Sequence, residues 1–270
     1  MHSRRLAICS WSLQPLNPLK LVWSIKQCGL QAVQLALVPL VEETEWENAQ
    51  DVILENGIEI VSGMLATVGE DYSTLESIEK TGGIRPDGTW PLTLSLAEKV
   101  ADIGEHVGLS LVTFHAGFMP EHQCVERVTM LHRLAQLGDL FSNKGIELAL
   151  ETGQEDAHTL AGVLEELSHP HVGVNFDPAN MILYGKGNPV QALELLHSWV
   201  KQVHIKDAIT AKSVGQWGEE VPVGKGEVCW AEFLQQLPDG VDLVIEREAG
   251  SQRVEDVQYA VSTLREFGVC

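Results

Sequence analysis

Four residues able to bind a cation each follow a short apolar run. Glu151 closes Leu-Ala-Leu-Glu, Asp177 closes Val-Asn-Phe-Asp, His204 follows a valine, and Glu246 closes Val-Ile-Glu. Carboxylates brought together repel one another, and a buried charge persists only when it is paired or coordinated. A divalent cation meets both conditions. The four residues therefore predict a metal centre, provided that the fold brings them together.

The donor types restrict the ion. Oxygen ligands with one imidazole and no thiolate suit Mn2+ or Mg2+ best, and Co2+, Fe2+ or Zn2+ can use the same ligands because affinity alone rarely selects among divalent ions. We expect one divalent metal ion per chain, with Mn2+ as the first choice. A nucleotide cofactor is not expected, because the sequence contains no Walker A or dinucleotide-binding fingerprint.

The elements that must position these residues alternate along the chain. Short apolar runs are followed by segments of helical periodicity, a pattern typical of βα units around a parallel sheet. The predicted strands are 6–10, 32–37, 58–64, 111–115, 146–151, 172–177, 200–206 and 243–246, and the clearest helices are 18–27, 92–107, 124–144, 159–167, 189–199 and 254–267. The length of 270 residues is close to the roughly 250 of a (β/α)8 barrel. We predict one (β/α)8 TIM barrel domain over residues 1–270.

The carboxyl ends of barrel strands converge on one mouth, so ligands far apart in the sequence become neighbours there. Two long connections, 66–91 and 207–230, follow predicted strands on the same face. Long loops in a compact domain tend to be lids or binding elements, and we expect both to shape the site. Trp11, Trp90 and Trp217 are candidates for an apolar wall against a sugar ring.

Short motifs recur in a specific order along the whole chain. They are Leu-Glu-Thr at 150–152, Phe-Asp at 176–177, Val-His-Ile-Lys-Asp at 203–207, Glu-Val-Pro-Val-Gly-Lys-Gly-Glu at 220–227 and Ile-Glu-Arg-Glu at 245–248. In this order and spacing the chain resembles the xylose-isomerase-like TIM barrels of the sugar phosphate isomerase/epimerase family, which includes ketose 3-epimerases and inosose isomerases. The resemblance implies that the four residues bind the metal and that Glu151 and Glu246 double as the acid/base pair.

The activity implied by this resemblance is a divalent-metal-dependent isomerase or epimerase of a sugar or sugar phosphate. The metal would polarise the carbonyl, and an enediolate would form as Glu151 and Glu246 transfer the proton. The sequence departs from ketose 3-epimerases at Asn180, where they commonly have a histidine, and at Thr210, where they often have an arginine. The sugar and its phosphorylation are therefore left open.

Other functions remain as alternatives. A base beside a polarised ketone can also expel a β-leaving group, so a metal-dependent lyase or dehydratase acting on keto-sugars, keto-inositols or 3-keto-glycosides is the main one. A non-enzymatic sugar-binding module is another. A nuclease is disfavoured, because the formal charge of −20 repels phosphate backbones and nucleic-acid binders carry a basic footprint.

Secondary site residues lie next to the predicted ligands. We expect His115, at a strand end, to contact a substrate hydroxyl, and Asn180, Lys206 and Asp207 to contact the substrate or orient a ligand. The Gly-Lys-Gly run at 224–226 lies where barrels often bind phosphate, which is a weak indication of a phosphorylated substrate.

Composition sets the remaining expectations. Hydrophobic residues make up 44% of the chain, no run approaches the ~20 apolar residues that cross a bilayer, and residues 1–13 lack the apolar core of a signal peptide. We expect a cytoplasmic protein without membrane or nucleic-acid partners, acting on a small sugar, with a homo-oligomer left open. The cysteines are odd in number and scattered, which predicts reduced thiols; they are Cys9, Cys28, Cys124, Cys229 and Cys270.

Overall fold

The computed structural model describes residues 4–213 and 215–269. Its centre is a closed barrel of parallel strands in the order β1-β10-β7-β6-β5-β4-β3-β2, in which β1 also pairs with β2. The barrel strands are β1 (Leu6–Cys9), β2 (Ala32–Ala36), β3 (Glu59–Leu65), β4 (Leu111–Phe114), β5 (Glu147–Glu151), β6 (Val172–Phe176), β7 (Val200–Ile205) and β10 (Asp242–Ile245). The predicted (β/α)8 barrel is confirmed, and each predicted strand lies within one residue of its observed bounds at either end.

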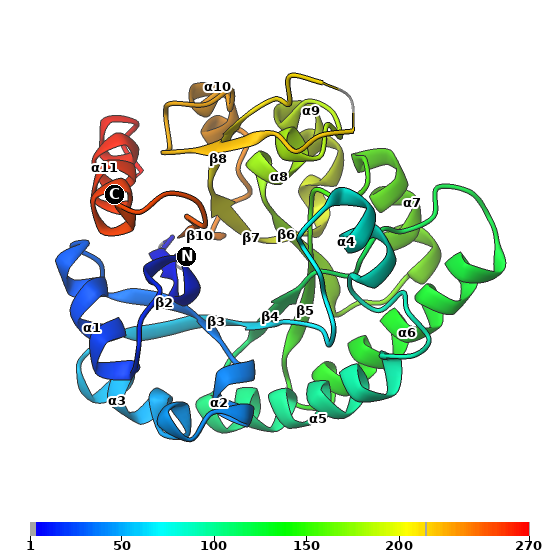
Figure 1. Ribbon diagram of the computed structural model, residues 1–270, viewed down its shortest axis with the longest axis horizontal. Coiled ribbons are helices and arrows are strands. Elements are labelled where there is room, and N and C mark those ends of the chain that lie inside the picture. Colours follow the sequence, from blue (N-terminus) through cyan, green and yellow to red (C-terminus); the bar gives the residue numbers. More distant parts are fainter. Residues whose placement is uncertain (1–3, 214, 270) are drawn as a thin grey trace.

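Helices surround this barrel as an outer layer (Figure 1). They are α1 (Pro18–Gln27), α2 (Val38–Glu42), α3 (Ala49–Glu55), α4 (Leu75–Thr81), α5 (Trp90–Val107), α6 (Val125–Ser142), α7 (Ala157–Leu167), α8 (Pro178–Leu183), α9 (Pro189–Leu196), α10 (Trp230–Gln235) and α11 (Arg253–Glu266). The prediction of a helix over 189–199 was too long, because the chain tightens into a 3-10 turn at His197–Trp199 before β7. In the described part of the chain no helix is long and apolar enough to span a membrane.

Local sequence sets where the helices begin. Asn17 precedes α1 and accepts a hydrogen bond from the backbone N–H of Lys20, while Pro18 occupies the first turn. Asp156 caps α7 in the same way by accepting from the backbone N–H of Thr159. Such caps satisfy backbone donors that the first helical turn leaves free, and proline is tolerated there because it has no N–H to lose. The strand-to-helix transitions are thus fixed close to the mouth.

The barrel strands carry two groups of buried side chains apart from the main core. One is a small apolar cluster that includes Ala7, Ala32, Val61 and Val244. The other consists of buried polar side chains that we call the polar layer: Gln34, Ser62, Thr113, Asn175 and Gln202. The main hydrophobic core lies between the strands and the helices, as in any such barrel. On β6 and β7 the polar layer lies directly before the predicted ligands, because Asn175 precedes Asp177 and Gln202 precedes His204 by two residues.

Both long connections carry structure of their own. The segment after β3 contains α4, and the segment after β7 forms a two-stranded antiparallel ribbon of β8 (Asp207–Ile209) and β9 (Glu219–Val221). Among the described residues, the cysteines are free thiols, as predicted; these are Cys9, Cys28, Cys124 and Cys229, whereas Cys270 lies outside the described residues.

Candidate metal centre

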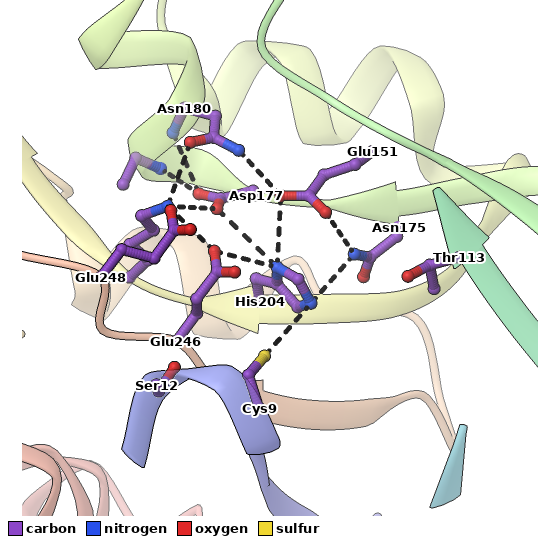
Figure 2. Close-up of polar contacts among 12 residues, drawn as sticks. Cys9, Ser12, Thr113, Glu151, Asn175, Asp177, Asn180, His204, Glu246 and Glu248 are labelled. Carbon is purple, nitrogen blue, oxygen red and sulfur yellow. Dashed lines mark hydrogen bonds and ion pairs between the residues drawn. The ribbon is translucent and has the colours of Figure 1, made fainter. Parts of the chain in front are cut away.

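The four predicted ligands meet at the mouth of the barrel. Glu151 is the last residue of β5, Asp177 and Glu246 directly follow β6 and β10, and His204 lies near the end of β7. Each offers one ligand atom, all four atoms lie within 4.8 Å of one another, and all four residues are buried. The carboxylates of Glu151, Asp177 and Glu246 point toward the His204 ring from three sides (Figure 2).

The centre of the cluster is deficient in positive charge. Nδ1 of His204 lies 3.3 Å from Oε2 of Glu246, 3.4 Å from Oε1 of Glu151 and 3.8 Å from Oδ2 of Asp177. Within the described structure, this Nδ1 and Oδ2 of Asp177 are buried without a hydrogen-bond partner. A buried polar atom without a partner costs about 1–3 kcal/mol. A cation between these atoms removes that cost, so the donor set fits a divalent metal.

The pKa of His204 reflects the same demand for a cation. Burial lowers this pKa, but Cys9 and the carboxylates of Glu151 and Glu246 outweigh burial and hold it well above the ordinary value. A metal ion must therefore displace a proton from the ring before it can bind the imidazole.

Asp177 divides its two oxygens between two tasks. Oδ1 accepts hydrogen bonds from the backbone N–H groups of Ala179 at 2.7 Å and Asn180 at 3.0 Å, which caps α8. Oδ2 faces the cluster. Burial raises the pKa of Asp177 to about 6, and the charge of Lys206 only partly offsets that rise. The capping role explains why β6 ends one residue before the predicted strand end.

The second ring nitrogen of His204 faces down into the polar layer. Nε2 lies 2.8 Å from Oε1 of Gln34, 3.0 Å from Nδ2 of Asn175 and 3.7 Å from Sγ of Cys9. We assign the proton to Nε2, which donates along the shortest of these contacts to Gln34. In the neutral ring the lone pair of Nδ1 then faces the three carboxylates, as ligation requires.

Hydrogen bonds link the rest of this layer. Gln34 donates through Nε2 to Oγ1 of Thr113 at 2.8 Å, and Gln202 donates to Oδ1 of Asn175 at 3.2 Å. Ser62 donates to Oε1 of Gln202 at 2.5 Å. Sequence reasoning missed these residues. Only Asn175 and Gln202 carried a signal: each lies two positions before a ligand, Asp177 or His204, at the spacing that keeps side chains on one face of a strand.

Glu151 is held by neutral and imidazole groups. Asn180 donates through Nδ2 to its Oε1 at 2.8 Å, and Asn175 donates to its Oε2 at 3.3 Å. Nε2 of His115 lies 3.6 Å from the same Oε2. Burial raises the pKa of Glu151, but the His115 and His204 rings outweigh it and the net shift is downward.

Glu246 has a different set of neighbours. Lys206 donates through Nζ to its Oε2 at 2.9 Å and to Oε2 of Glu248 at 2.6 Å, while Trp11 donates through Nε1 to Oε1 of Glu246 at 2.7 Å. Burial raises the pKa of Glu246, yet the Lys206 ammonium and the His204 ring bring it well below the ordinary value. The carboxylate of Glu246 is thus held by a direct ammonium contact from Lys206.

A cavity of about 750 Å3 opens above the cluster. Among the predicted substrate contacts, His115, Asn180 and Lys206 line it. Both long connections contribute to its wall as predicted, through Glu70 and Tyr72 from the first and Trp217 and Gly218 from the second. Leu183 at the end of α8 and Tyr184 after it also line the cavity, which the sequence did not suggest. Trp11 also lines the cavity, whereas Trp90 lies at the start of α5 under the guanidinium of Arg133.

Asp207 does not take the predicted place beside the substrate. It is fully buried, and its Oδ2 accepts from the backbone N–H groups of Gly224 at 2.8 Å and Gly226 at 3.1 Å and from Nε1 of Trp230 at 2.9 Å. Its Oδ1 accepts from the N–H of Val228 at 3.2 Å. The carboxylate therefore organises the loop between β9 and α10 and has no acceptor left for a substrate.

A sequence profile of the family described as xylose isomerase-like TIM barrel matches residues 24–267. The chain belongs to this family. The family resemblance expected from the motifs is thereby confirmed.

The proteins to which the chain is similar differ in how much of it they match. The uncharacterised protein YihM of Escherichia coli K12 is 26% identical over 148 residues, which cover 52% of this chain and 45% of YihM, so the match spans less than half of that protein. A xylose isomerase domain protein from Planctomyces limnophilus is 29% identical, with a TM-score of 0.85 and 91% of both chains covered.

Two more distant structures carry ligands. A xylose isomerase-like protein from Mycobacterium smegmatis in complex with magnesium has a TM-score of 0.74, 16% identity and 99% coverage of both chains. A D-allulose 3-epimerase from Methylomonas sp. in complex with D-allulose has a TM-score of 0.73, 14% identity and 98% coverage of both chains. At these identities the likeness establishes the fold alone.

Proposed function

We propose that the protein is a divalent-metal-dependent isomerase or epimerase of keto-sugars, in which Glu151, Asp177, His204 and Glu246 hold the metal and the two glutamates move the proton. The observation that carries this proposal is that the glutamates reach one point from separate strands. Glu151 comes from β5 and Glu246 follows β10, and their oxygens lie 3.4 and 3.3 Å from Nδ1 of His204. Support also comes from the family, in which relatives include an epimerase bound to a ketose.

The bound metal would supply an electrophile for the carbonyl oxygen of the sugar and stabilise the charge of an enediolate. Mn2+ stays our first choice for this ligand set, and the structural neighbour in complex with magnesium supports Mg2+ as the second. The chain itself must bring a base to the adjacent C–H bond. Glu151 suits this role because Asn180 fixes its Oε1, whereas the carboxylate of Glu246 is engaged by the Lys206 ammonium.

The fate of the proton then decides the reaction. Return from Glu246 on the opposite face inverts the carbon and gives an epimer, whereas return to the neighbouring carbon gives an aldose–ketose isomerisation. Lys206 keeps Glu246 ionised and in place through a 2.9 Å contact. We assign hydroxyl binding to His115, whose Nε2 lies 3.6 Å from Oε2 of Glu151 on the cavity lining.

Hydrogen exchange tests the proposal. The protein is stripped with a chelator, reloaded with Mn2+ and incubated with a panel of keto-sugars in D2O, and NMR locates the deuterium. We expect about one ion per chain by elemental analysis and metal-dependent deuteration at the carbon next to the carbonyl. His204→Ala serves as the control, because it removes a ligand and leaves both glutamates in place.

Two results would contradict this assignment. Full activity of the metal-free protein would remove the metal from the mechanism. A metal-loaded protein that eliminates a substituent β to the carbonyl, and yields an unsaturated ketone, would identify the lyase alternative instead.

A further inference from the structure

The loop where barrels of this type often bind phosphate is already filled in this protein. Three backbone N–H groups, from Gly224, Gly226 and Val228, and the indole N–H of Trp230 all donate to the carboxylate of Asp207. Converging backbone donors of this kind form an anion-binding nest. Here the anion is a side chain of the protein itself, so the nest cannot receive a phosphate group.

The lysine of the same loop is turned elsewhere. Nζ of Lys225 lies 4.9 Å from the centre of the Tyr259 ring on α11, a cation–π contact. Neither the donors nor the charge of the Gly-Lys-Gly run is therefore directed at the cavity. The weak sequence indication of a phosphorylated substrate loses its structural basis.

The cavity lining is acidic. Glu70, Glu220, Glu246 and Glu248 all line it, and the single lysine or arginine among the described residues of the lining is Lys206. That ammonium already contacts Glu246 at 2.9 Å and Glu248 at 2.6 Å. A phosphate ester carries about −1.5 to −2 charges at pH 7. It would enter a cavity whose lysine is already paired with Glu246 and Glu248, and it would meet the carboxylate of Glu70 on the lining, whereas Glu220 is paired with Arg247.

Three aromatic side chains on the cavity lining form what we call the aromatic wall: Tyr72, Tyr184 and Trp217. The rings of Tyr184 and Trp217 pack edge to face with centroids 4.7 Å apart. Val38, Pro39 and Met64 add apolar surface elsewhere on the lining. The cavity volume of about 750 Å3 lies toward the upper end of the ~300–1,000 Å3 that holds drug-sized ligands. There is room and apolar surface for a group beyond the reacting sugar.

From these observations we infer that the substrate is an uncharged keto-sugar glycoside: the sugar occupies the metal end of the cavity, and an apolar or ring-shaped aglycone packs on the aromatic wall. This inference rests on the proposed function, since it assumes that the four-residue cluster binds the keto-sugar. It sharpens that function by excluding sugar phosphates.

Matched ligands separate the inference from the function on which it rests. We would measure the affinity of the Mn2+-loaded protein by calorimetry for 3-keto-D-glucose, its 6-phosphate and phenyl 3-keto-β-D-glucoside, which share one keto-sugar. The phenyl glycoside should bind at least tenfold more tightly than the free sugar, and the phosphate at least tenfold more weakly. Deuterium exchange on the same samples reports on catalysis independently of affinity.

Two variants assign the effects to residues. Trp217→Ala should weaken binding of the phenyl glycoside about tenfold and leave the ratio between free sugar and phosphate unchanged. Glu70→Gln should raise the affinity for the 6-phosphate and leave the affinity for the free sugar unchanged. The matched controls are Trp23→Ala on the exposed face of α1 and Glu165→Gln on the exposed face of α7, and neither should alter any affinity.

The outcomes are distinct. If the 6-phosphate of the keto-sugar binds as tightly as the free sugar, the exclusion of charged substrates is overturned. If the phenyl glycoside binds no better than the free sugar, the role of the aromatic wall is overturned. The predicted order of affinities without deuterium exchange in any keto-sugar would leave the inference on ligands standing and refute the proposed catalysis.

Discussion

Glu151 and Glu246 are surrounded by unlike groups, amides and imidazoles in one case and an ammonium and an indole in the other. We predict that Glu151→Gln and Glu246→Gln each lower kcat by about 10²–10⁴-fold, the usual scale for losing an acid or base. The substitution keeps the size and one acceptor oxygen, so the deficit should persist at saturating metal. Steady-state kinetics with added Mn2+ measures it.

Deuterium exchange refines this prediction. If both faces of the sugar are used, each variant should still exchange the proton nearest its remaining glutamate without completing the reaction. Asp177→Asn is the control, because it alters a ligand and leaves both bases intact. If either glutamine variant turned over normally at saturating metal, the replaced glutamate would serve only as a metal ligand. The two-base mechanism would then be wrong.

Gln34 gives a second prediction at the scale of single residues. Its Oε1 accepts from Nε2 of His204 at 2.8 Å and so holds the proton away from the nitrogen that faces the carboxylates. Gln34→Leu should weaken metal binding about 10–100-fold, the usual cost of losing the partner of a ligand histidine. Gln34→Glu keeps an acceptor and should restore most of the affinity. Calorimetric metal titration compares the two.

The control for this prediction lies in the same polar layer. Ser62 donates to Gln202 and makes no hydrogen bond to His204, so Ser62→Ala should lower the free energy of unfolding without changing metal affinity. Equal losses of metal affinity in Gln34→Leu and Ser62→Ala would mean that the layer acts through general packing rather than through the histidine tautomer.

At the scale of elements, the conformation of the loop between β9 and α10 requires its backbone at Gly226 to lie close to the carboxylate of Asp207. A Cβ atom on Gly226 would lie 2.1 Å from Oδ1 of Asp207 and 2.5 Å from the backbone oxygen of Ala208. Gly226→Ala should therefore destabilise the protein by about 2 kcal/mol or more. Gly88→Ala, at an exposed position with nothing within 4 Å, is the matched control. Urea unfolding measures both, and equal effects would contradict the loop geometry.

For the whole molecule, we expect the free energy of unfolding to depend on pH because of Glu155, a buried carboxyl group outside the metal cluster. Burial raises the pKa of Glu155 to about 7 from the ordinary 4.5, although the Met119 backbone N–H and Lys186 partly oppose the rise. Between these pH values the folded protein keeps a proton that the unfolded chain has lost, so the free energy of unfolding falls as pH rises from 4.5 to 7. The loss amounts to at most about 3 kcal/mol.

Replacing this acid tests the sign of the effect. Glu155→Gln cannot ionise, so it should be more stable than the wild type at pH 8 and equal to it near pH 4.5. Urea unfolding at both pH values measures the difference, with Glu165→Gln as the exposed control. A difference that is the same at both pH values would show that Glu155 is not the titrating group.

Much of this molecule could be predicted from its sequence because barrel strands follow strict rules. Ligands at the ends of apolar runs had to meet at one mouth, and Glu151, Asp177 and His204 do so with Glu246. The polar layer was not predicted, since an isolated residue such as Gln34 within an apolar strand carries no local signal of its partner. Asp207 was misplaced for another reason: proximity to His204 in the chain does not specify the direction of a side chain once the strand has ended.

The occupied nest around Asp207 also has an evolutionary consequence. A single nucleotide change converts an aspartate codon to an alanine codon, and here it would leave the N–H groups of Gly224, Gly226, Val228 and Trp230 directed at a vacant anion-sized space. We expect Asp207→Ala to be unstable alone and to regain thermal stability in inorganic phosphate or sulfate, a chemical rescue that chloride should not match. The present chain would then stand one mutation away from a buried anion site that lies beside the cavity rather than within it.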